Sequence, residues 1–506
     1  MKRAPWLQSS VLLFMLVFIT GTSSAQNQLQ EVIINWDKVI RVSQTIPSLQ
    51  VVVNPPLRRG SAIHDNAFQS LRDLGADYVR YVPWYPYPKL AIPELDPPSG
   101  GKTFWDFSLI DPMTIDFLEA TKGHPVVLNF STVPQWMYKV EKPVPYPEDP
   151  DKPIWDYVQG TELRDPSMKE IGDYYGRLFS WYTNGGFTDE VGKRHESGYH
   201  YSIPLWEVLN EVDFEHDTKA DTYTRMYDSI VGSIRKVKPD TKFVGMSLGA
   251  PHEIPDFFEY FLNPKNHKPG IPLDYISYHF YAIPAPDQGP EIQEHVFFAQ
   301  ADGFLKGVGY VELIRKRLSP STRTTINEVG SISADDVKMV YEKKDIPDPI
   351  PDSYWNLTSA MYAYIFAELS KMGAEVVNMS QLVGYPTQFP SVSIVDWTTG
   401  KPNTRYRMLQ LLKDNFGPGD KIVETKVGKI PHIYSYASAV ITKDGKRRVL
   451  LINKRNRKIE VSVPGASGGQ QVYIDQMTAF SPPASNKLAS DIVKLNGLAV
   501  AVVTLP

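Results

Sequence analysis

The stretch Leu205-Trp206-Glu207-Val208-Leu209-Asn210-Glu211-Val212 decides how this sequence is interpreted. Its apolar positions predict a buried parallel strand, and that strand runs directly into an amide and a carboxylate. A second stretch of the same kind follows later in the chain, Arg323-Thr324-Thr325-Ile326-Asn327-Glu328-Val329-Gly330. In a (β/α)8 barrel, polar side chains at the carboxyl ends of the strands face one crevice. The two stretches therefore predict that Glu211 and Glu328 face each other at the mouth of such a barrel.

The rest of the chain supplies the other strands of a barrel. Strand-like runs alternate with helical patterns at 49–53, 77–84, 124–130, 205–211, 243–248, 273–281, 323–330 and 375–381. Eight alternations predict an α/β fold, a (β/α)8 TIM barrel that covers residues 49–415. From residue 416 to residue 506 the runs are shorter and separated by turn residues, which predicts an accessory antiparallel β-sandwich. Strands in residues 26–48 are expected to join this β-sandwich.

The first 25 residues form a separate segment. Lys2 and Arg3 precede a short apolar run, Val11 to Ile19, and small residues lead to a predicted cut after Ala25. This pattern is typical of a signal peptide, 1–25, and the apolar run is shorter than the roughly 20 residues of a spanning helix. The sequence therefore predicts a secreted protein, extracellular or periplasmic, with no membrane contact after cleavage. An uncleaved anchor is the alternative.

Composition excludes several classes of protein. The chain has 506 residues and no cysteine, so its stability has to come from a core that 42% apolar residues can supply. No basic cluster interleaves with aromatic residues, and a net charge of −4 gives no reason to expect a nucleic-acid partner. No metal-ligand spacing and no phosphate-binding loop is present, so we expect no metal and no cofactor. Tyr and Trp are abundant, and their rings stack well on sugars.

Three motifs carry a resemblance to a known group of enzymes. Trp-Glu-Val-Leu-Asn-Glu at 206–211, Tyr-His-Phe-Tyr at 278–281 and Ile-Asn-Glu-Val-Gly at 326–330 resemble clan A of the glycoside hydrolases. The two-domain plan looks most like family 39, which includes β-xylosidases and α-L-iduronidase. The sequence departs from that family where Val212-Asp213 stands in place of its usual Pro. It also departs at the end of the eighth strand, where Gln381 and Tyr385 come and no Trp is found.

The resemblance implies roles for individual residues. Glu211 would be the acid/base and Glu328 the nucleophile of a retaining enzyme, since such enzymes need one protonated and one ionised carboxyl group. The other positions that match the clan's site are Asn210, Arg80, His279 and Tyr281. We expect Arg80 to keep Glu328 ionised, Tyr281 to donate a hydrogen bond to it, and Asn210 to contact a sugar hydroxyl. His279 would bind a hydroxyl or orient a neighbour.

Other polar and aromatic residues have less specific predictions. Substrate subsites are expected to include Trp84, Asn129, Trp136 and Trp155, with core packing as the alternative for each. Glu207 is expected to be buried and structural, whereas Asp213 and Glu215 are expected to begin a solvated helix. Glycosylation sequons occur at Asn129, Asn356 and Asn378, of which Asn129 and Asn378 fall at strand ends and are interpreted as chance matches.

The sequence thus predicts a secreted retaining glycoside hydrolase whose partner is an oligosaccharide or polysaccharide. Two alternatives stay open: a catalytically silent barrel that only binds carbohydrate, and a transglycosylase that uses the same site. The sugar, the choice between endo and exo action, and the oligomeric state are not specified by the sequence.

Overall fold

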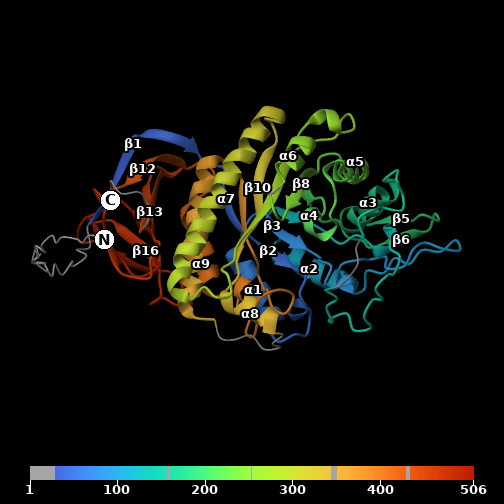
Figure 1. Ribbon diagram of the computed structural model, residues 1–506, viewed down its shortest axis with the longest axis horizontal. Coiled ribbons are helices and arrows are strands. Elements are labelled where there is room, and N and C mark those ends of the chain that lie inside the picture. Colours follow the sequence, from blue (N-terminus) through green and yellow to red (C-terminus); the bar gives the residue numbers. More distant parts are fainter. Residues whose placement is uncertain (1–28, 156–159, 252–253, 343–349, 429–433) are drawn as a thin grey trace, which may run out of the picture.

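The computed structural model describes residues 29–155, 160–251, 254–342, 350–428 and 434–506. The predicted signal peptide lies outside these residues. Two bodies lie side by side: a barrel with its helices, and a β-domain at one end of the long axis (Figure 1).

Eight parallel strands close into a barrel, which confirms the predicted fold class. Around the barrel they follow one another in the order β10, β11, β2, β3, β4, β7, β8 and β9. Their bounds are β2 (Ile46–Val52), β3 (Val79–Val82), β4 (Val126–Leu128), β7 (Leu205–Glu207), β8 (Lys242–Leu248), β9 (Tyr275–Ala282), β10 (Arg323–Ser331) and β11 (Val376–Met379). Almost every residue in them is buried, as expected of strands covered on both faces.

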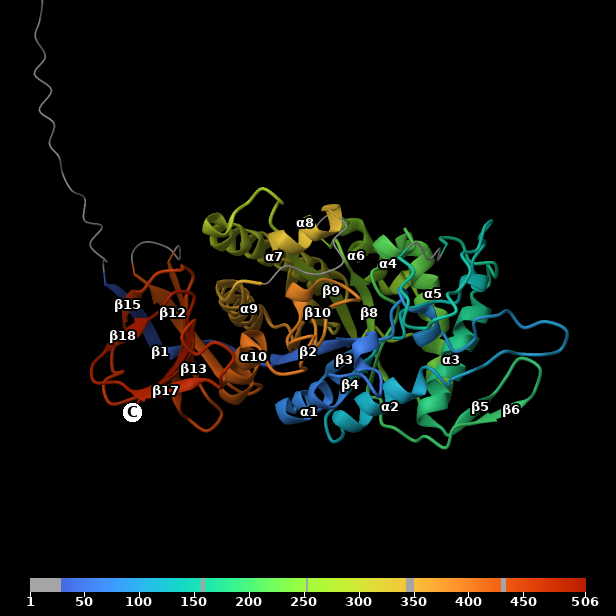
Figure 2. The ribbon, with the colours of Figure 1, turned by 90° about the horizontal axis from the view of Figure 1, so that it is seen from below.

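Helices surround the barrel in the order that a (β/α)8 fold requires (Figure 2). They are α1 (His64–Leu74), α2 (Asp111–Ala120), α3 (Lys169–Thr183), α4 (Val212–Glu215), α5 (Ala220–Val237), α6 (Pro255–Phe261), α7 (Pro290–Leu318), α8 (Ala334–Glu342), α9 (Asp352–Met372) and α10 (Thr404–Asn415). Short 3₁₀ turns occur at η1 (Pro55–Leu57), η2 (Pro88–Leu90), η3 (Gln135–Met137), η4 (Pro264–Asn266) and η5 (Pro390–Val392). Helix α9 is buried on nearly every side because it packs on α7, on α10 and on the β-domain (Figure 1).

The β-domain is a nine-stranded sheet formed by both ends of the chain. Its strands, in sheet order, are β17 (Ala484–Lys487), β16 (Gln470–Ile474), β19 (Val500–Thr504), β14 (Arg447–Asn453), β13 (Ser435–Ile441), β12 (Lys421–Val427), β1 (Gln30–Val42), β15 (Ile459–Ser462) and β18 (Ile492–Leu495). All pairs are antiparallel except β1 and β15, which run parallel. The sequence predicts only antiparallel pairing. Strand β1 pairs antiparallel with β12, as predicted, so only its pairing with β15 departs from the prediction.

A small hairpin, β5 (Gly186–Thr188) and β6 (Arg194–Glu196), follows α3 and was not predicted. Gly186 has a φ of 131°, and a Cβ there would lie 2.1 Å from the carbonyl oxygen of His195. Only glycine fits this position, so the chain can pair closely at the start of the hairpin.

All three sequons are buried, and this decides how they are interpreted. Asn129 and Asn378 have no exposed surface and Asn356 only 1%. A glycan needs an exposed asparagine, so these matches are structural residues. Within the described part of the chain, no helix has the length and apolar character to cross a membrane.

Candidate active site

Glu211 and Glu328 lie at the carboxyl ends of facing strands, as the sequence predicts. Glu211 follows β7 and Glu328 lies near the end of β10. One carboxylate oxygen of each residue and Nδ1 or Nε2 of His279 lie within 4.8 Å of one another. The two carboxyl groups are therefore close enough to act on one bond of a substrate.

The backbone that carries Glu211 is locally strained. Leu209 and Glu211 have φ values of 63° and 39°, in the left-handed region that non-glycine residues rarely occupy. On the neighbouring strand β8, Met246 and Ser247 have φ values of 77° and 50°. The two segments hold each other, since the backbone N–H of Glu211 donates to the carbonyl oxygen of Ser247 at 2.8 Å. Strain of this kind persists only where the surrounding structure enforces it, and it is concentrated at functional sites.

Arg80, on β3, is the buried cation of the site. Its guanidinium donates to Glu328 Oε1 at 2.5 Å and to Asn210 Oδ1 at 2.6 Å. It also donates to Glu207 Oε2 at 2.5 Å, and further acceptors are Gln50 and Ser247. Arg80 has no exposed surface, so these contacts replace all of its hydration. The predicted pairing of Arg80 with Glu328 is present.

Glu328 is surrounded by donors. Besides Arg80, the hydroxyl of Tyr281 donates to its Oε2 at 2.6 Å. Burial alone would raise the pKa of Glu328, but the charges of His279 and Arg80 and the hydrogen bonds from Tyr281 and Arg80 outweigh it and leave the pKa below its ordinary value. The environment thus favours the ionised form of Glu328.

Glu211 has the opposite environment. Burial raises the pKa of Glu211 above its ordinary value, although a 2.7 Å contact with His279 Nδ1 and the charge of that ring oppose the rise. The charge of Glu328 adds to the increase. His279 Nε2 lies 2.9 Å from Ser247 Oγ, so the ring is fixed from both sides. Two carboxyl groups with pKa values displaced in opposite directions can divide acid and nucleophile roles between them.

Glu215 and Asp213 differ from the prediction. Both were expected at a solvated helix start, but α4 turns them inward. Glu215 Oε1 accepts hydrogen bonds from Trp84 Nε1 at 2.8 Å and from Asn210 Nδ2 at 3.0 Å. Asp213 accepts from the backbone N–H groups of Gly249 and Ala250 at 3.0 and 2.9 Å. The reason is the left-handed turn at Glu211, which folds the next residues back over the strand ends.

A cavity of about 660 Å³ opens beside the two glutamates. Its polar lining includes Glu211, Glu328, His279 and Tyr281, together with Gln300 and Gln388. Its wall is largely aromatic and aliphatic and contains Trp84, Phe214, Phe280, Ile283, Phe304, Ile332 and Phe389. Phe214 is 65% exposed at the rim. A polar end with an aromatic wall suits a sugar ring, which has polar edges and apolar faces.

The predicted subsite residues divide into two groups. Trp84 lines the cavity, and Trp155, which is 50% exposed, packs edge-on against it with ring centroids 5.7 Å apart. Asn129 is fully buried behind the site, where its amide donates to Glu207 Oε2 at 2.7 Å and to the Leu209 carbonyl at 3.0 Å. Trp136 donates to the Glu94 carbonyl at 2.9 Å, lies under Arg164, and is not among the described residues that line the cavity. Asn129 is therefore a structural residue, and Trp136 lies outside this cavity.

Several residues that complete the site were not predicted from the sequence. They are Gln50, Ser247, Ser380 and Glu215. Ser380 Oγ lies 2.5 Å from the Tyr281 hydroxyl and accepts from Gln50 Nε2 at 2.8 Å. Gln50, Ser247 and Ser380 lie in or next to barrel strands, and inward-facing polar residues on such strands were the available signal.

The cluster of Glu211, His279 and Glu328 also has to be tested as a metal site. Its three ligand atoms are near enough to one another to contact one ion. However, Glu328 already accepts from the cationic Arg80 and from Tyr281, and a second cation would be repelled there. The donor set fits a hydrogen-bonded carboxylate pair better than a metal centre.

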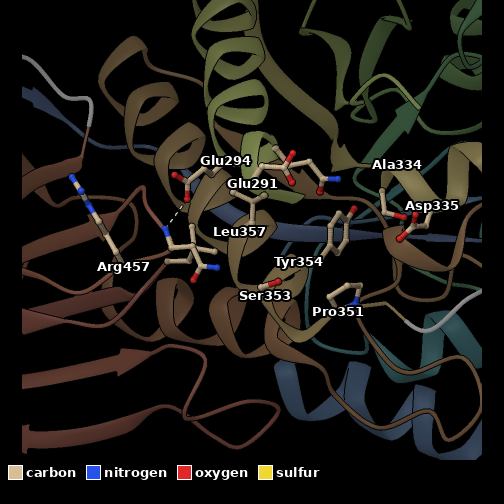
Figure 3. A pocket seen from close by; sticks show the side chains of 13 residues that line it. Glu291, Glu294, Ala334, Asp335, Pro351, Ser353, Tyr354, Leu357 and Arg457 are labelled. Atoms are coloured by element: carbon tan, nitrogen blue, oxygen red, sulfur yellow. Dashed lines mark hydrogen bonds between the residues drawn. The ribbon is translucent and has the colours of Figure 1, made fainter. Parts of the chain in front are cut away.

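A second cavity, of about 340 Å³, lies between the barrel and the β-domain. Figure 3 shows Glu291, Glu294, Tyr354 and Arg457 around it. Glu294 accepts a hydrogen bond from the backbone N–H of Asn456 at 2.6 Å, so it joins the two domains. Neither Glu211 nor Glu328 lines this cavity. We assign the candidate site to the barrel mouth, where those two residues share one cavity.

Comparison with known proteins supports the fold. No protein-family model matches this sequence, and no curated protein is similar to it at a significant level. Among solved structures, it is similar to a GH51 arabinofuranosidase from Xanthomonas axonopodis pv. citri, with a TM-score of 0.64 at 12% identity over 94% of this chain and 100% of the other. It is also similar to an α-L-arabinofuranosidase from Thermotoga maritima, with a TM-score of 0.61 at 14% identity over 94% of this chain and 99% of the other.

A GH30 endoxylanase from Clostridium papyrosolvens C71 gives a TM-score of 0.56 at 14% identity over 94% and 99% of the two chains. These are clan A glycosidases, which share the (β/α)8 fold with family 39. At these identities the likeness concerns the fold alone, and the family 39 resemblance stays a prediction.

Proposed function

We propose that this protein is a retaining glycoside hydrolase in which Glu211 is the acid/base and Glu328 the nucleophile. One observation carries the proposal: two glutamates from facing strand ends share one cavity, and their pKa values are displaced in opposite directions. Retaining enzymes hold their carboxyl groups about 5–5.5 Å apart, whereas inverting enzymes need about 6.5–9.5 Å to admit a water. The nearest oxygens here, within 4.8 Å, favour the retaining geometry.

In the proposed first step, Glu328 attacks the anomeric carbon while the protonated Glu211 gives its proton to the leaving oxygen. The glycosidic C–O bond breaks, an ester forms between the sugar and Glu328, and the aglycone leaves as an alcohol. In the second step, Glu211 takes a proton from water, whose oxygen attacks the same carbon and frees Glu328. His279, fixed between Glu211 and Ser247, would hold the acid/base in place through both steps.

The substrate is proposed to be a glycoside of a pentose or hexose from an oligosaccharide or polysaccharide. The similar structures include arabinofuranosidases and an endoxylanase, and the family 39 resemblance adds β-xylosides to the set. A second function, transglycosylation, is favoured by two exposed rings on which an acceptor sugar could stack: Phe214, which lines the cavity, and Trp155, which packs against the cavity residue Trp84. A silent binding protein is less well supported, because it would not need the separated pKa values.

Export is part of the proposal. The signal-peptide pattern supports it, and one similar structure is a conserved exported protein from Bacteroides fragilis, with a TM-score of 0.58 at 11% identity over 94% and 100% of the two chains.

Turnover of a panel of aryl β-xylosides, β-glucosides and α-L-arabinofuranosides tests the function. We expect hydrolysis of at least one member, with the first-formed sugar retaining its anomeric configuration by proton NMR. The control is Glu211→Gln/Glu328→Gln, which keeps the size of both side chains. Binding of sugars without turnover would favour the silent barrel, inverted product would exclude the retaining mechanism, and glycosyl transfer to an added sugar would favour transglycosylation.

A further inference from the structure

Glu215 is a third carboxyl group beside the proposed catalytic pair. It lies four residues after Glu211, at the end of α4. Its Oε1 accepts from two neutral donors, the indole of Trp84 and the amide of Asn210. Its Oε2 is buried and has no hydrogen-bond partner in the described structure. Glu215 thus joins a wall residue of the cavity to a residue that contacts Arg80.

The charges around Glu215 do not favour a carboxylate there. The nearby guanidinium of Arg80 is already paired with Glu207 and Glu328, and no described ion pair includes Glu215. Burial raises the pKa of Glu215 well above its ordinary value, and the charges of Glu211 and Glu328 raise it further against the bonds from Asn210 and Trp84. Among the described residues, the phenols of Tyr85, Tyr138 and Tyr175 are also near enough for the charge of Glu215 to raise their pKa values.

We propose that Glu215 is a positioning residue, held as a neutral carboxylic acid, that fixes Trp84 in the cavity wall and Asn210 beside Arg80. The inference deepens the proposed function and rests on it. A neutral acid supplies the acceptor that both donors need without placing a negative charge next to Glu211. An ionised Glu215 would oppose the ionisation of Glu211. It would therefore move the alkaline limb of the pH profile of kcat/KM, which reports that ionisation, to higher pH.

Two variants separate the parts of this proposal. Glu215→Gln keeps a carbonyl oxygen for Trp84 and Asn210 and carries no charge, so kcat/KM should stay within about threefold of the unmutated enzyme and its alkaline limb should not move. Glu215→Ala leaves both donors without their acceptor. Since each hydrogen bond contributes about 1 kcal/mol, KM should rise about ten- to thirtyfold, with a smaller change in kcat on activated substrates.

Glu94→Gln is the matched control for the pH profile. Glu94 is another buried glutamate, whose pKa burial raises to about 8, and its Oε1 accepts from the backbone N–H of Phe104 at 3.1 Å outside the site. An alkaline limb that moves to lower pH by a unit or more in Glu215→Gln, but not in Glu94→Gln, would show that Glu215 carries a charge and would overturn the proposal. Equal losses of kcat/KM in Glu215→Gln and Glu215→Ala would also overturn the proposal.

An infrared difference spectrum tests the protonation without activity. At pH 6 the spectrum of the unmutated protein minus that of Glu215→Gln should show the C=O band of a protonated carboxyl group, and Glu94→Gln provides a positive control for such a band. A carboxylate band in its place would overturn the neutral acid even if hydrolysis were established. Conversely, a protein that hydrolyses no glycoside would remove the proposed function and the positioning role, while this spectrum would still report the state of Glu215.

Discussion

Tyr281→Phe is the change that most sharply tests the electrostatics of Glu328. It removes the hydroxyl of Tyr281, which donates to Glu328 Oε2 at 2.6 Å, and leaves the ring in place. A hydrogen bond to a charged group contributes about 1.5–3 kcal/mol, and one pH unit of displacement corresponds to about 1.4 kcal/mol. Glu328 is only 7% exposed, so solvent screens little of this effect. We therefore expect the acidic limb of kcat/KM to move toward higher pH by about one to two units, because Glu328 becomes harder to ionise.

The assay is a pH series of kcat/KM on one activated aryl glycoside, with Tyr278→Phe as control. Tyr278 lies on the same strand, and its buried hydroxyl has no hydrogen-bond partner among the described residues. Loss of the Tyr278 hydroxyl should leave the acidic limb of kcat/KM unmoved. An acidic limb that stays in place in Tyr281→Phe, or moves to lower pH, would refute the reasoning.

Stability should change in the same variant with a defined sign. The pKa of Glu328 in the folded protein lies below its ordinary value of 4.5, so the carboxylate stabilises the fold above that pH, and the contribution is lost as pH falls through the folded value. The loss of Tyr281 should accordingly lower Tm more at pH 7 than at pH 3.

Three further predictions concern the rest of the chain. Glu207→Gln should lower the free energy of unfolding in denaturant by about 3–5 kcal/mol, because it breaks a buried ion pair with Arg80. The control Glu162→Gln, which breaks an exposed ion pair, should change it by less than about 1 kcal/mol. Equal effects of the two changes would contradict the structural role of Glu207. Burial lowers the pKa of Lys454, enclosed by Tyr364, to about 8. Between pH 8 and 10.5 the unfolded chain therefore binds more protons at Lys454 than the folded protein does. The free energy of unfolding of the unmutated protein, relative to that of Lys454→Met, should rise with pH across this range. A difference that stays constant with pH would contradict the prediction. Amino-terminal sequencing of the exported protein should recover Gln26 at or near its start; recovery of Met1 would exclude cleavage.

The barrel could be predicted because each strand is a short apolar run with its own boundary signals. The Glu211 and Glu328 positions followed from this, since the end of a parallel strand in a closed barrel fixes where its last side chains lie. The pairings of Arg80 with Glu328 and of Tyr281 with Glu328 were also within reach, because strand order alone brings β3, β9 and β10 to one mouth.

Glu215 shows what the sequence could not specify. The residues after Glu211 are polar and resemble an ordinary helix start, and nothing in them signals the left-handed turn that folds them inward. Trp136 is a second example: an aromatic residue in a long loop suggests a sugar platform, but it lies outside the cavity and its indole N–H donates to the Glu94 carbonyl. Both outcomes depend on loop conformation, which is set by contacts distant in sequence rather than by local propensity.

The central claim, that Glu328 is the nucleophile and Glu211 the acid/base, is tested most directly by azide rescue of the two alanine variants. Glu211→Ala should still cleave aryl glycosides with activated leaving groups in its first step, and azide, which needs no general base, should release the sugar as a glycosyl azide of retained configuration. Glu328→Ala should be inactive on every substrate and should yield no retained azide product. Retained glycosyl azide from Glu328→Ala, with Glu211→Ala inactive on activated substrates, would contradict the assignment.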